Sequence, residues 1–525
     1  MEINLKQTYL GIELGSTRIK AVLINDRYET IASGEYSWEN EYRDGLWTYE
    51  LADAMKGIQQ AYRQIKETVE ASYGKKLDRV GSIGVSAMMH GYLPFNQHGE
   101  QLADFRTWRN TNTSEAAQQL TEEFQFNIPL RWSVAHLYQA IIDQETHIND
   151  IDFMTTLAGY IHWQLTGEKV LGIGDASGMF PVNPDTLDYE TSMVDQFNHL
   201  LKGKNISYDL IDIFPKVLSA GEAAGQLTDV GAKYLDPSGD LQAGITVCPP
   251  EGDAGTGMVA TNSIKEHTGN VSAGTSIFSM LVLEDHLTNY YKEIDVVNTP
   301  DGKVVAMVHC NNFTSDINDW VSMFEETFDL LGFKVDRHNL FTKLFESSLE
   351  ADEKVGDLVH CSYYSGEPIT NIDEGRPLFV RTPNSRLTIS NFMRSQINAA
   401  LATLKIGMDL LIDEEKVQID NIFGHGGFFK TEKVGQQLLA DALNTKVTLL
   451  DNAEEGGAWG MALLAAYHVK SHRQTLEDFL LKDVFKEVEE KVLAPTKEGV
   501  IIFNDYVEKY HSVLQLEKLA GNLLK

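Results

Sequence analysis

Apolar and polar residues alternate in two stretches of the chain that lie about half its length apart. The first, YLGIELGSTRIKAVLIND, runs from Tyr9 to Asp26, and the second, TGNVSAGTSIFSMLVLED, runs from Thr268 to Asp285. In each stretch a short apolar run is followed by a turn of small residues and then by a second strand-like run. This pattern predicts the same β-hairpin in both halves of the chain. Its repetition indicates two duplicated domains.

The turns of the two predicted hairpins place glycine before two hydroxyl residues. The six residues are Gly15, Ser16 and Thr17 in the first turn, and Gly274, Thr275 and Ser276 in the second. Such a turn exposes backbone N–H groups and hydroxyls without bulky side chains, so it can bind phosphate oxygens. One turn of this kind is common in ordinary hairpins, so the prediction of a nucleotide site rests on the repetition.

An acidic residue, Glu13, stands two positions before Gly15 of the first turn. Magnesium prefers oxygen ligands and keeps part of its hydration shell. Glu13 is therefore a candidate to hold Mg²⁺ through water.

The stretch CPPEGDAGTGM surrounds a single aspartate, Asp253, with mostly small residues. One interpretation is structural, because Asp is a favoured helix N-cap and the residues from Ala254 to Ala260 could begin a helix. The other is functional, because small neighbours leave a carboxylate open to a substrate. These residues alone leave both interpretations open.

Size and charge limit the classes of function. The chain has 525 residues, which favours two large domains. Its 76 acidic residues against 44 basic ones give a net charge of −32, which would repel nucleic acid and anionic membranes. The three cysteines have no paired spacing, and the sequence shows neither an export signal nor a membrane helix. We therefore expect a cytoplasmic protein with no nucleic-acid or membrane partner.

Several further segments, taken with the hairpins, resemble one family in the same order. They are SAMMHGYLPFNQHGEQL, GDASGMF, FPKVLSAGEAAGQLT, EGDAGTGM, IFGHGGFFKTEKVGQQLLADAL and EEGGAWGMALLAA. Together they resemble the FGGY carbohydrate kinases, most closely the xylulokinase branch, over nearly all of the first 470 residues.

The resemblance implies the fold and the domains. The fold is α/β, with two duplicated ribonuclease-H-like domains of the actin-like ATPase type and a cleft between them. The expected ranges are an N-terminal domain at 1–247, a C-terminal domain at 248–470 and a helical C-terminal extension at 471–525.

The resemblance also implies the site. Asp253 falls at the position of the catalytic base, Met89 and His90 fall in the sugar segment, and Gly426 and Gly427 fall in the adenosine-binding segment. The cosubstrate is ATP, with Mg²⁺. Phosphoryl transfer has a loose transition state, so an aspartate with an ordinary pKa near ~4 would be a sufficient base.

The chain departs from the family at two places. Glu13 stands where the family has Asp, and TWRNTNT stands where it has Trp-x-Asp-x-Arg, so Asn110 and Asn112 replace Asp and Arg. We expect His90 and Asn110 to line one pocket and to read the configuration of adjacent sugar hydroxyls. A changed polar pocket suggests a changed sugar.

The expected function is an ATP-dependent kinase that phosphorylates the terminal primary hydroxyl of a ketopentose. D-Xylulose is the first choice, and L-ribulose or another sugar or polyol of the family is the alternative. An actin-like ATPase acting on protein partners and a sugar-binding regulator without turnover are the rivals. A homodimer is compatible with all of them.

Overall fold

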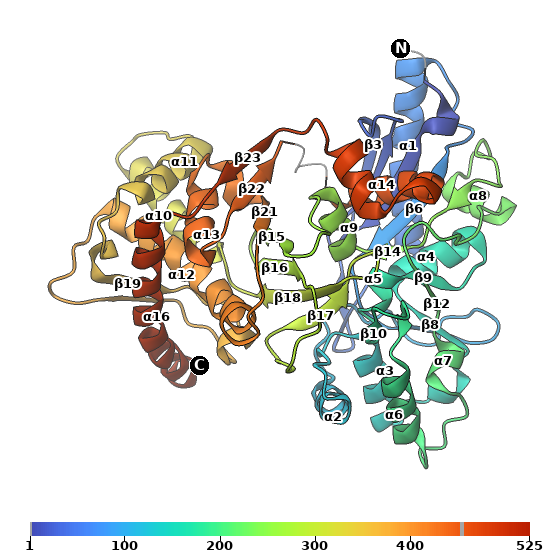
Figure 1. The fold of residues 1–525 in the computed structure, drawn as a ribbon, viewed down its shortest axis with the longest axis horizontal. Helices are drawn as coiled ribbons and strands as arrows, with labels where there is room; N and C mark the ends of the chain where they lie inside the picture. Colours follow the sequence, from blue (N-terminus) through green and yellow to red (C-terminus); the bar gives the residue numbers. More distant parts are fainter. Residues whose placement is uncertain (1–2, 452–455, 525) are drawn as a thin grey trace. The chain divides into compact units, whose positions relative to one another are not determined.

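The computed structural model describes residues 3–451 and 456–524, and the chain forms two compact units (Figure 1). Unit 1 comprises Met1–Ile264, Glu284–Val305 and Glu455–Val488, and unit 2 comprises Lys265–Leu283, Ala306–Glu454 and Glu489–Lys525. Each unit is therefore assembled from three separate segments of the chain.

These units divide the chain at other residues than the ranges expected from the sequence. Residues 248–264 lie in unit 1, because the helix α9 (Asp253–Ala260) packs against the strand β6 (Ser82–Ala87) and the helix α14 (Gly456–Lys470). The expected helical extension is split between the units. Its strand β23 (Glu490–Leu493) pairs antiparallel with β22 (Val447–Leu450) and so extends the sheet of unit 2.

The sheet of unit 1 contains the first predicted hairpin. Its main strands are β1 (Tyr9–Leu14), β2 (Arg18–Ile24), β3 (Thr30–Ser37), β6 and β13 (Thr246–Val247), in the spatial order β3-β2-β1-β6-β13. β1 and β2 are antiparallel, and β6 runs parallel to β1. A short strand, β14 (Glu251–Gly252), also pairs with β6 and leads directly into α9.

The sheet of unit 2 repeats this arrangement with the second predicted hairpin. Its strands β15 (Thr268–Ala273), β16 (Ile277–Val282), β18 (Val304–Cys310), β21 (Asn421–His425) and β22 lie in the order β18-β16-β15-β21-β22. β21 runs parallel to β15, as β6 does to β1. Numbered from the hairpin, both sheets have the order 3-2-1-4-5, so the predicted hairpins and the duplicated architecture are confirmed.

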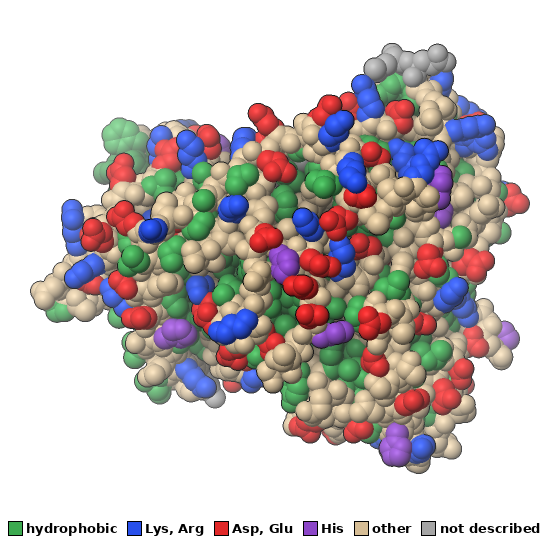
Figure 2. Space-filling model, in the orientation of Figure 1, with side chains coloured by type: hydrophobic (Ala, Val, Ile, Leu, Met, Phe, Trp, Pro, Cys, Tyr) green, Lys and Arg blue, Asp and Glu red, His purple; other side chains and the backbone are tan. Residues whose placement is uncertain are grey.

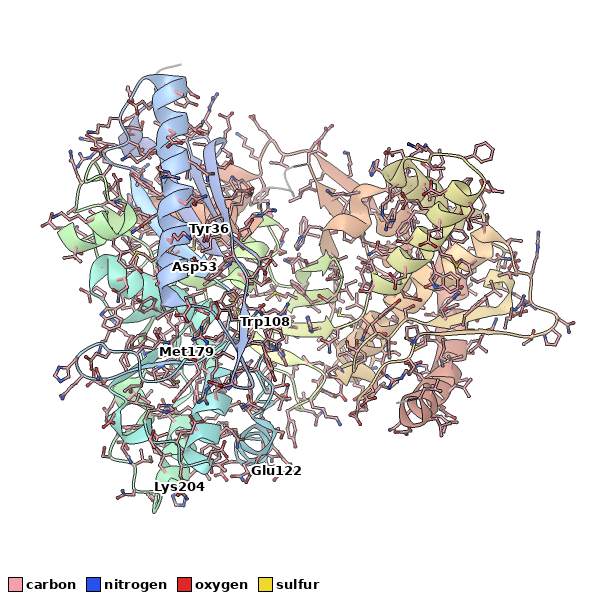
Figure 3. The ribbon with its side chains drawn as sticks, turned by 180° about the vertical axis from the view of Figure 1, so that it is seen from behind. Tyr36, Asp53, Trp108, Glu122, Met179 and Lys204 are labelled. Carbon is pink, nitrogen blue, oxygen red and sulfur yellow. The ribbon has the colours of Figure 1, made fainter. Side chains whose placement is uncertain are left out.

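The helix α1 (Leu51–Tyr73) covers the hairpin side of the first sheet, and its sequence explains the packing. Ala54, Ile58, Ala61, Ile65 and Val69 recur at helical spacing and are buried. A Cβ at Gly34 of β3 would lie 2.0 Å from the Ala61 carbonyl oxygen, so glycine is what lets the helix approach the strand. The Tyr36 hydroxyl of β3 donates to Asp53 Oδ1 of the same helix at 2.9 Å (Figure 3).

The core of unit 2 is built on α12 (Ile389–Asp409), most of whose residues are buried. The C-terminal helix α16 (Lys497–Leu523), predicted from its apolar spacing, is tied to it through Tyr506, whose hydroxyl donates to the Ser395 carbonyl at 2.7 Å. The remaining helices of this unit are α10 (Ser315–Leu330), α11 (Arg337–Ser347) and α13 (Val434–Leu443). A two-stranded sheet of β19 (Leu358–Cys361) and β20 (Leu378–Arg381) lies beside α16 and α12.

The remaining elements of unit 1 are short. Its helices are α2 (Ser114–Phe124), α3 (Ser133–Ile142), α4 (Leu157–Thr166), α5 (Ile173–Ala176), α6 (Thr191–Leu201), α7 (Leu210–Ile213), α8 (Asp229–Leu235) and α15 (Leu476–Phe479). Its minor strands are β4 (Glu41–Arg43), β5 (Leu46–Thr48), β7 (Leu93–Phe95), β8 (Phe153–Thr155), β9 (Val170–Gly172), β10 (Val182–Asn183), β11 (Asp188–Tyr189) and β12 (Lys216–Leu218). The strand β17 (Asp295–Asn298) is the edge strand next to β18 in the seven-stranded sheet.

The surface carries the excess of acidic residues noted in the sequence. Figure 2 shows Asp and Glu side chains over the whole visible face, interspersed with Lys and Arg. Among the described residues, no helix is both long enough and apolar enough to span a membrane.

Candidate active site

Asp253 is the first residue of α9, and Gly252 before it occupies the N-cap position. Of the two interpretations that the residues left open, the one in which Asp253 is itself the N-cap is therefore wrong. Its half-buried carboxylate accepts a hydrogen bond at Oδ1 from the Met89 backbone N–H, 3.2 Å away. A Cβ at Gly252 would lie 2.2 Å from Met89 Cγ, so glycine is required for this close approach.

Burial raises the pKa of Asp253 to about 6, although the N–H groups of Met89 and Ala254 lower it in part. The expectation of an ordinary aspartate pKa is thus corrected. A carboxylate of this pKa is ionised at neutral pH and is a better proton acceptor than an exposed aspartate.

Glu13, at the end of β1, belongs to the same site. Its Oε2 accepts the Ala458 N–H of α14 at 2.9 Å. Burial, and next the negative charge of Asp253, raise the pKa of Glu13 to about 7. The two carboxylates therefore lie close enough to repel each other, which a cation beside them would relieve.

The helix α14 approaches β1 closely, which explains its small residues. A Cβ at Gly11 would lie 2.1 Å from the Ala458 carbonyl oxygen, and one at Gly460 would lie 2.1 Å from the Thr256 carbonyl oxygen. Gly460 is thus used for packing within unit 1, whereas a Cβ at Gly456 would meet nothing within 4 Å. Glu454 and Glu455, the first two residues of the segment, lie outside the described residues.

Two further buried acids, Asp175 and Glu251, adjoin the site and were not predicted. Glu251 Oε2 accepts the Asp175 N–H at 3.0 Å, and Asp175 Oδ2 accepts the Thr156 hydroxyl at 2.6 Å. Burial raises the pKa of Asp175 to about 7 and that of Glu251 to about 8. Both lie in segments already noted, GDASGMF and EGDAGTGM, where an acid among small residues was the available signal.

His90 lies beside Met89 in a left-handed backbone conformation, with φ of 67°. Its Nδ1 is 3.0 Å from the Gly178 carbonyl oxygen, which can only accept, so Nδ1 carries the proton. Burial, and next the charge of Arg131, lower the pKa of His90 to about 3, so the ring is neutral. With Nδ1 donating to Gly178, His90 can therefore offer a substrate only a hydrogen-bond acceptor, at Nε2.

Asn110 is close to the sugar segment but its amide is fully engaged. Its Oδ1 accepts the Trp47 N–H at 2.9 Å, and its Nδ2 donates to the carbonyl oxygens of Trp47 and Thr107 at 2.7 and 3.2 Å. The segments meet as expected, because Tyr92 and Arg106 pair through their backbones. This use of the amide argues against a direct contact between Asn110 and a sugar; Asn110 anchors the β4–β5 hairpin instead.

The first turn is held by aromatic side chains from the same unit. The Trp38 indole donates to the Gly15 carbonyl oxygen at 2.7 Å, and the Tyr49 hydroxyl donates to that of Ser16 at 2.6 Å. Thr17 is exposed, and Ser16 is half-buried. The carbonyl oxygens of Gly15 and Ser16 are thus both held by hydrogen bonds from aromatic side chains.

The second turn has a similar arrangement in unit 2. The Phe313 N–H donates to the Thr275 carbonyl oxygen at 3.1 Å, and the Thr314 hydroxyl donates to that of Gly274 at 2.6 Å. Gly274 and Thr275 are exposed, and Ser276 is half-buried.

Unit 2 brings the adenosine-segment glycines next to this second hairpin. Gly426 follows β21 with φ of 105°, and a Cβ there would lie 2.5 Å from the Ala273 carbonyl oxygen. A Cβ at Gly427, which begins the 3-10 helix η7 (Gly427–Lys430), would meet open space. The open space beside the backbone of Gly427 is compatible with a flat ligand group such as a purine ring.

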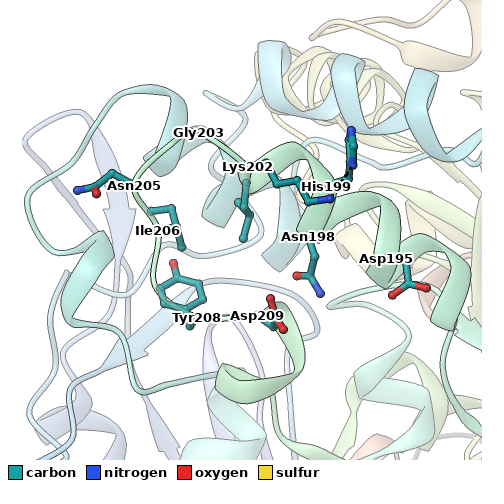
Figure 4. Close-up of a pocket in the computed structure, with 10 residues that line it drawn as sticks. Asp195, Asn198, His199, Lys202, Gly203, Asn205, Ile206, Tyr208 and Asp209 are labelled. Carbon is teal, nitrogen blue, oxygen red and sulfur yellow. Dashed lines mark hydrogen bonds between the residues drawn. The ribbon is translucent and has the colours of Figure 1, made fainter.

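A pocket of about 860 Å³ lies elsewhere in unit 1, along α6 and the loop that follows it (Figure 4). It is lined by Asp195, Asn198, His199, Leu201, Lys202, Gly203, Asn205, Ile206, Tyr208 and Asp209. These residues include none of those predicted for the site, and we assign the pocket no role.

Models of one family match most of the chain. The N-terminal domain of the FGGY family of carbohydrate kinases matches residues 8–255, and its C-terminal domain matches residues 269–469. Curated relatives include xylulose kinases from Haemophilus influenzae, 21% identical over 87% of this chain and 90% of that protein, and from Bacillus subtilis, 21% identical over 87% of each.

Solved structures share the fold at lower identity. A ligand-bound xylulose kinase from Lactobacillus acidophilus matches with a TM-score of 0.79 and 16% identity over 99% of this chain and 100% of that chain. A gluconate kinase from the same organism matches with a TM-score of 0.80 and 17% identity over 99% of both. The fold is the two-domain sugar-kinase form of the actin-like ATPases. The chain thus belongs to the FGGY family of carbohydrate kinases and is an ATP-dependent sugar kinase.

Proposed function

We propose that the protein transfers the γ-phosphoryl group of ATP to the terminal primary hydroxyl of a ketopentose, with D-xylulose as first choice and L-ribulose as second. The observation that carries this proposal is Asp253, a half-buried carboxylate with its pKa raised to about 6, held by the sugar-segment residue Met89. The curated relatives described above are xylulose kinases, which supports D-xylulose.

In this reaction Asp253 accepts the proton of the sugar hydroxyl as its oxygen bonds to the γ-phosphorus. The bond from that phosphorus to the bridging oxygen breaks, and ADP leaves with the electron pair. Because the transition state is loose, most of the acceleration comes from positioning the reactants. His90 would contribute by accepting a hydrogen bond from one sugar hydroxyl at Nε2.

The residues present fit Mg²⁺ bound through water. The negative charges of Glu13 and Asp253 repel each other. Oε2 of Glu13 accepts the Ala458 N–H. No group of three or more His, Cys, Asp or Glu within residues 3–451 and 456–524 forms a metal cage, which suits an ion held mainly by phosphates and water. When bound, Mg²⁺ neutralises phosphate charge.

Glu13→Gln should raise the Mg²⁺ concentration for half-maximal velocity about tenfold and leave the sugar KM unchanged.

The residues also fit ATP. Thr17 of the first turn and Gly274 and Thr275 of the second turn are exposed, and Gly427 has open space where a side chain would stand. We assign Gly15, Ser16 and Thr17 and Gly274, Thr275 and Ser276 to the phosphates, and Gly426 and Gly427 to the adenosine.

The test is ADP release measured with ATP, Mg²⁺ and a panel of D-xylulose, L-ribulose, D-ribulose, glycerol and gluconate. The proposal expects release only with an acceptor, and fastest with D-xylulose. Release fastest with glycerol or gluconate would contradict the ketopentose assignment. Release at the same rate without any acceptor would indicate an ATPase that acts on another partner.

A further inference from the structure

Residues 311–314, called here the 311–314 segment, join β18 to α10 and hold the second turn. Phe313 donates its N–H to the Thr275 carbonyl oxygen at 3.1 Å, and Thr314 donates its hydroxyl to that of Gly274 at 2.6 Å. Both bonds fix carbonyl oxygens of the turn. The conformation of the turn therefore depends on where this segment lies.

The same segment also contacts the adenosine-binding glycines. The Phe313 ring packs edge-on against Phe428 of η7, with ring centroids 5.0 Å apart. Phe428 follows Gly427 directly and is buried. A shift of the 311–314 segment would therefore move both parts of the nucleotide site in unit 2.

The segment is anchored by one fully buried carboxylate, Glu367. Its Oε2 accepts the backbone N–H groups of Asn311 and Asn312 at 2.9 and 3.2 Å, and the Asn312 Nδ2 at 3.1 Å. Glu367 itself is fixed, because its backbone pairs with Ile372 through bonds of 2.7 and 3.1 Å. Hydrogen bonds to a carboxylate are stronger and more directional than those to neutral acceptors.

Asn312 completes this connection from the other side. Its Oδ1 accepts the N–H groups of Tyr364 and Ser365 at 2.8 and 3.0 Å. The loop 364–367 and the 311–314 segment are thus joined through both side chains. Packing alone would not require a carboxyl group here, because burying one costs free energy that apolar residues would not, and burial raises the pKa of Glu367 to about 7.

We infer that Glu367 is a positioning residue for the nucleotide, which orients the second turn and η7 through the 311–314 segment. This rests on the proposed assignment of the Gly274–Ser276 turn to the phosphates of ATP. In this role Glu367 acts through its hydrogen bonds to Asn311 and Asn312.

The first test is Glu367→Gln, measured as the Kd of ADP by calorimetry without sugar. Glutamine fills the same space, but its NH₂ group cannot accept the N–H bonds and its carbonyl is a neutral acceptor. We expect the Kd of ADP to rise about tenfold and the sugar KM to change less than about twofold. Thr314→Val, outside the buried cluster, removes one bond to the turn and should raise the Kd of ADP about threefold.

Glu517 of α16 provides a matched control. It is also a fully buried glutamate of unit 2, and it accepts the Arg376 backbone N–H. Glu517→Gln should lower Tm as Glu367→Gln does, but leave the Kd of ADP unchanged. If Glu367→Gln lowered Tm and left ADP affinity at the wild-type value, its role would be structural only and the inference would be overturned.

Gly274→Ala separates this inference from the function proposed above. If it leaves ADP affinity unchanged, the assignment of the turn is wrong and the inference falls with it. If it weakens ADP binding while Glu367→Gln and Thr314→Val do not, the inference alone is overturned. Should Glu367→Gln fail to fold, Thr314→Val decides between these outcomes.

Discussion

The backbone N–H of Met89 donates to Oδ1 of Asp253 across 3.2 Å, although the two residues are 164 positions apart in the chain. The bond fixes the orientation of the carboxylate. It also ties the sugar segment to the proposed base, so that acceptor and base are positioned by the same contact.

Replacing the proposed base gives the first prediction. Asp253→Asn keeps the shape of the side chain but removes its ability to accept a proton, so kcat should fall by about two to four orders of magnitude. The Kd values of ADP and sugar, measured by calorimetry, should stay near those of the parent protein.

Asp229 provides a control for this substitution, because it is also the first residue of a helix, α8, and is exposed. Asp229→Asn removes a similar charge at a helix start and should leave kcat unchanged. An Asp253→Asn enzyme with nearly normal kcat would remove the base assignment.

The raised pKa of Asp253 predicts a dependence of activity on pH. A general base works only when deprotonated, so kcat/KM should be constant above about pH 7 and fall tenfold per unit below about pH 6. The pKa of Glu13 is raised to about 7 and the two groups interact, so the measured midpoint belongs to the pair. A midpoint near ~4, the value of an exposed aspartate, would show that burial does not act on the base as described.

Two glycines of unit 2 should respond differently to alanine. A Cβ at Gly274 would meet only the Ser276 carbonyl oxygen, at 3.9 Å, whereas one at Gly426 would lie 2.5 Å from the Ala273 carbonyl oxygen in a left-handed conformation. Gly274→Ala should therefore raise the ATP KM about tenfold and change the free energy of unfolding by less than about 0.5 kcal/mol. Gly426→Ala should lose more than about 1 kcal/mol of that free energy. Equal loss of stability in both variants would contradict this difference.

His90 and Asn110 should also be separable. His90→Ala removes a hydrogen-bond acceptor and should change the ratio of kcat/KM between D-xylulose and its epimers about tenfold. Asn110→Asp places a carboxylate against the carbonyl oxygens of Trp47 and Thr107, so it should cost about 3 kcal/mol of unfolding free energy. It should also lower kcat/KM for all the sugars by the same factor. A selective effect of Asn110→Asp on kcat/KM for one sugar would show that Asn110 contacts the substrate.

The sequence allowed both hairpins to be predicted, because each depends on a local pattern, whereas the role of Asp253 as a base rests on the family resemblance. The alternation that buries Ile12 and Leu14 is visible within one strand, and so is the turn after it. The segment 490–493 was expected to be part of a helical extension but forms a strand. A four-residue strand at a sheet edge is too short to show the two-residue alternation of apolar and polar positions, so the sequence could not reveal it.

The chemistry of the site was predicted only in part, because it depends on distant contacts. The sequence identifies Asn110 as a polar residue but does not reveal that Trp47, 63 positions away, uses its amide. The pKa values of Asp253 and Glu13 likewise follow from burial and from each other, which no local pattern reports. Asp175 and Glu251 carried a local signal, an acid among small residues, but their closeness to each other and to Asp253 depends on the fold.

The bond from Ala458 to Glu13 joins residues that are 445 positions apart in the chain. During synthesis the first hairpin therefore leaves the ribosome long before α14 does, and until then β1 lacks the helix that packs against Gly11. Unit 1 can be completed only after the whole of α14 has been synthesised, when most of unit 2 has already emerged. We expect nascent chains that stop before Gly456 to be cut readily by protease within β1, and chains that extend past Lys470 to resist. Equal resistance of both would show that the first sheet matures without its last helix.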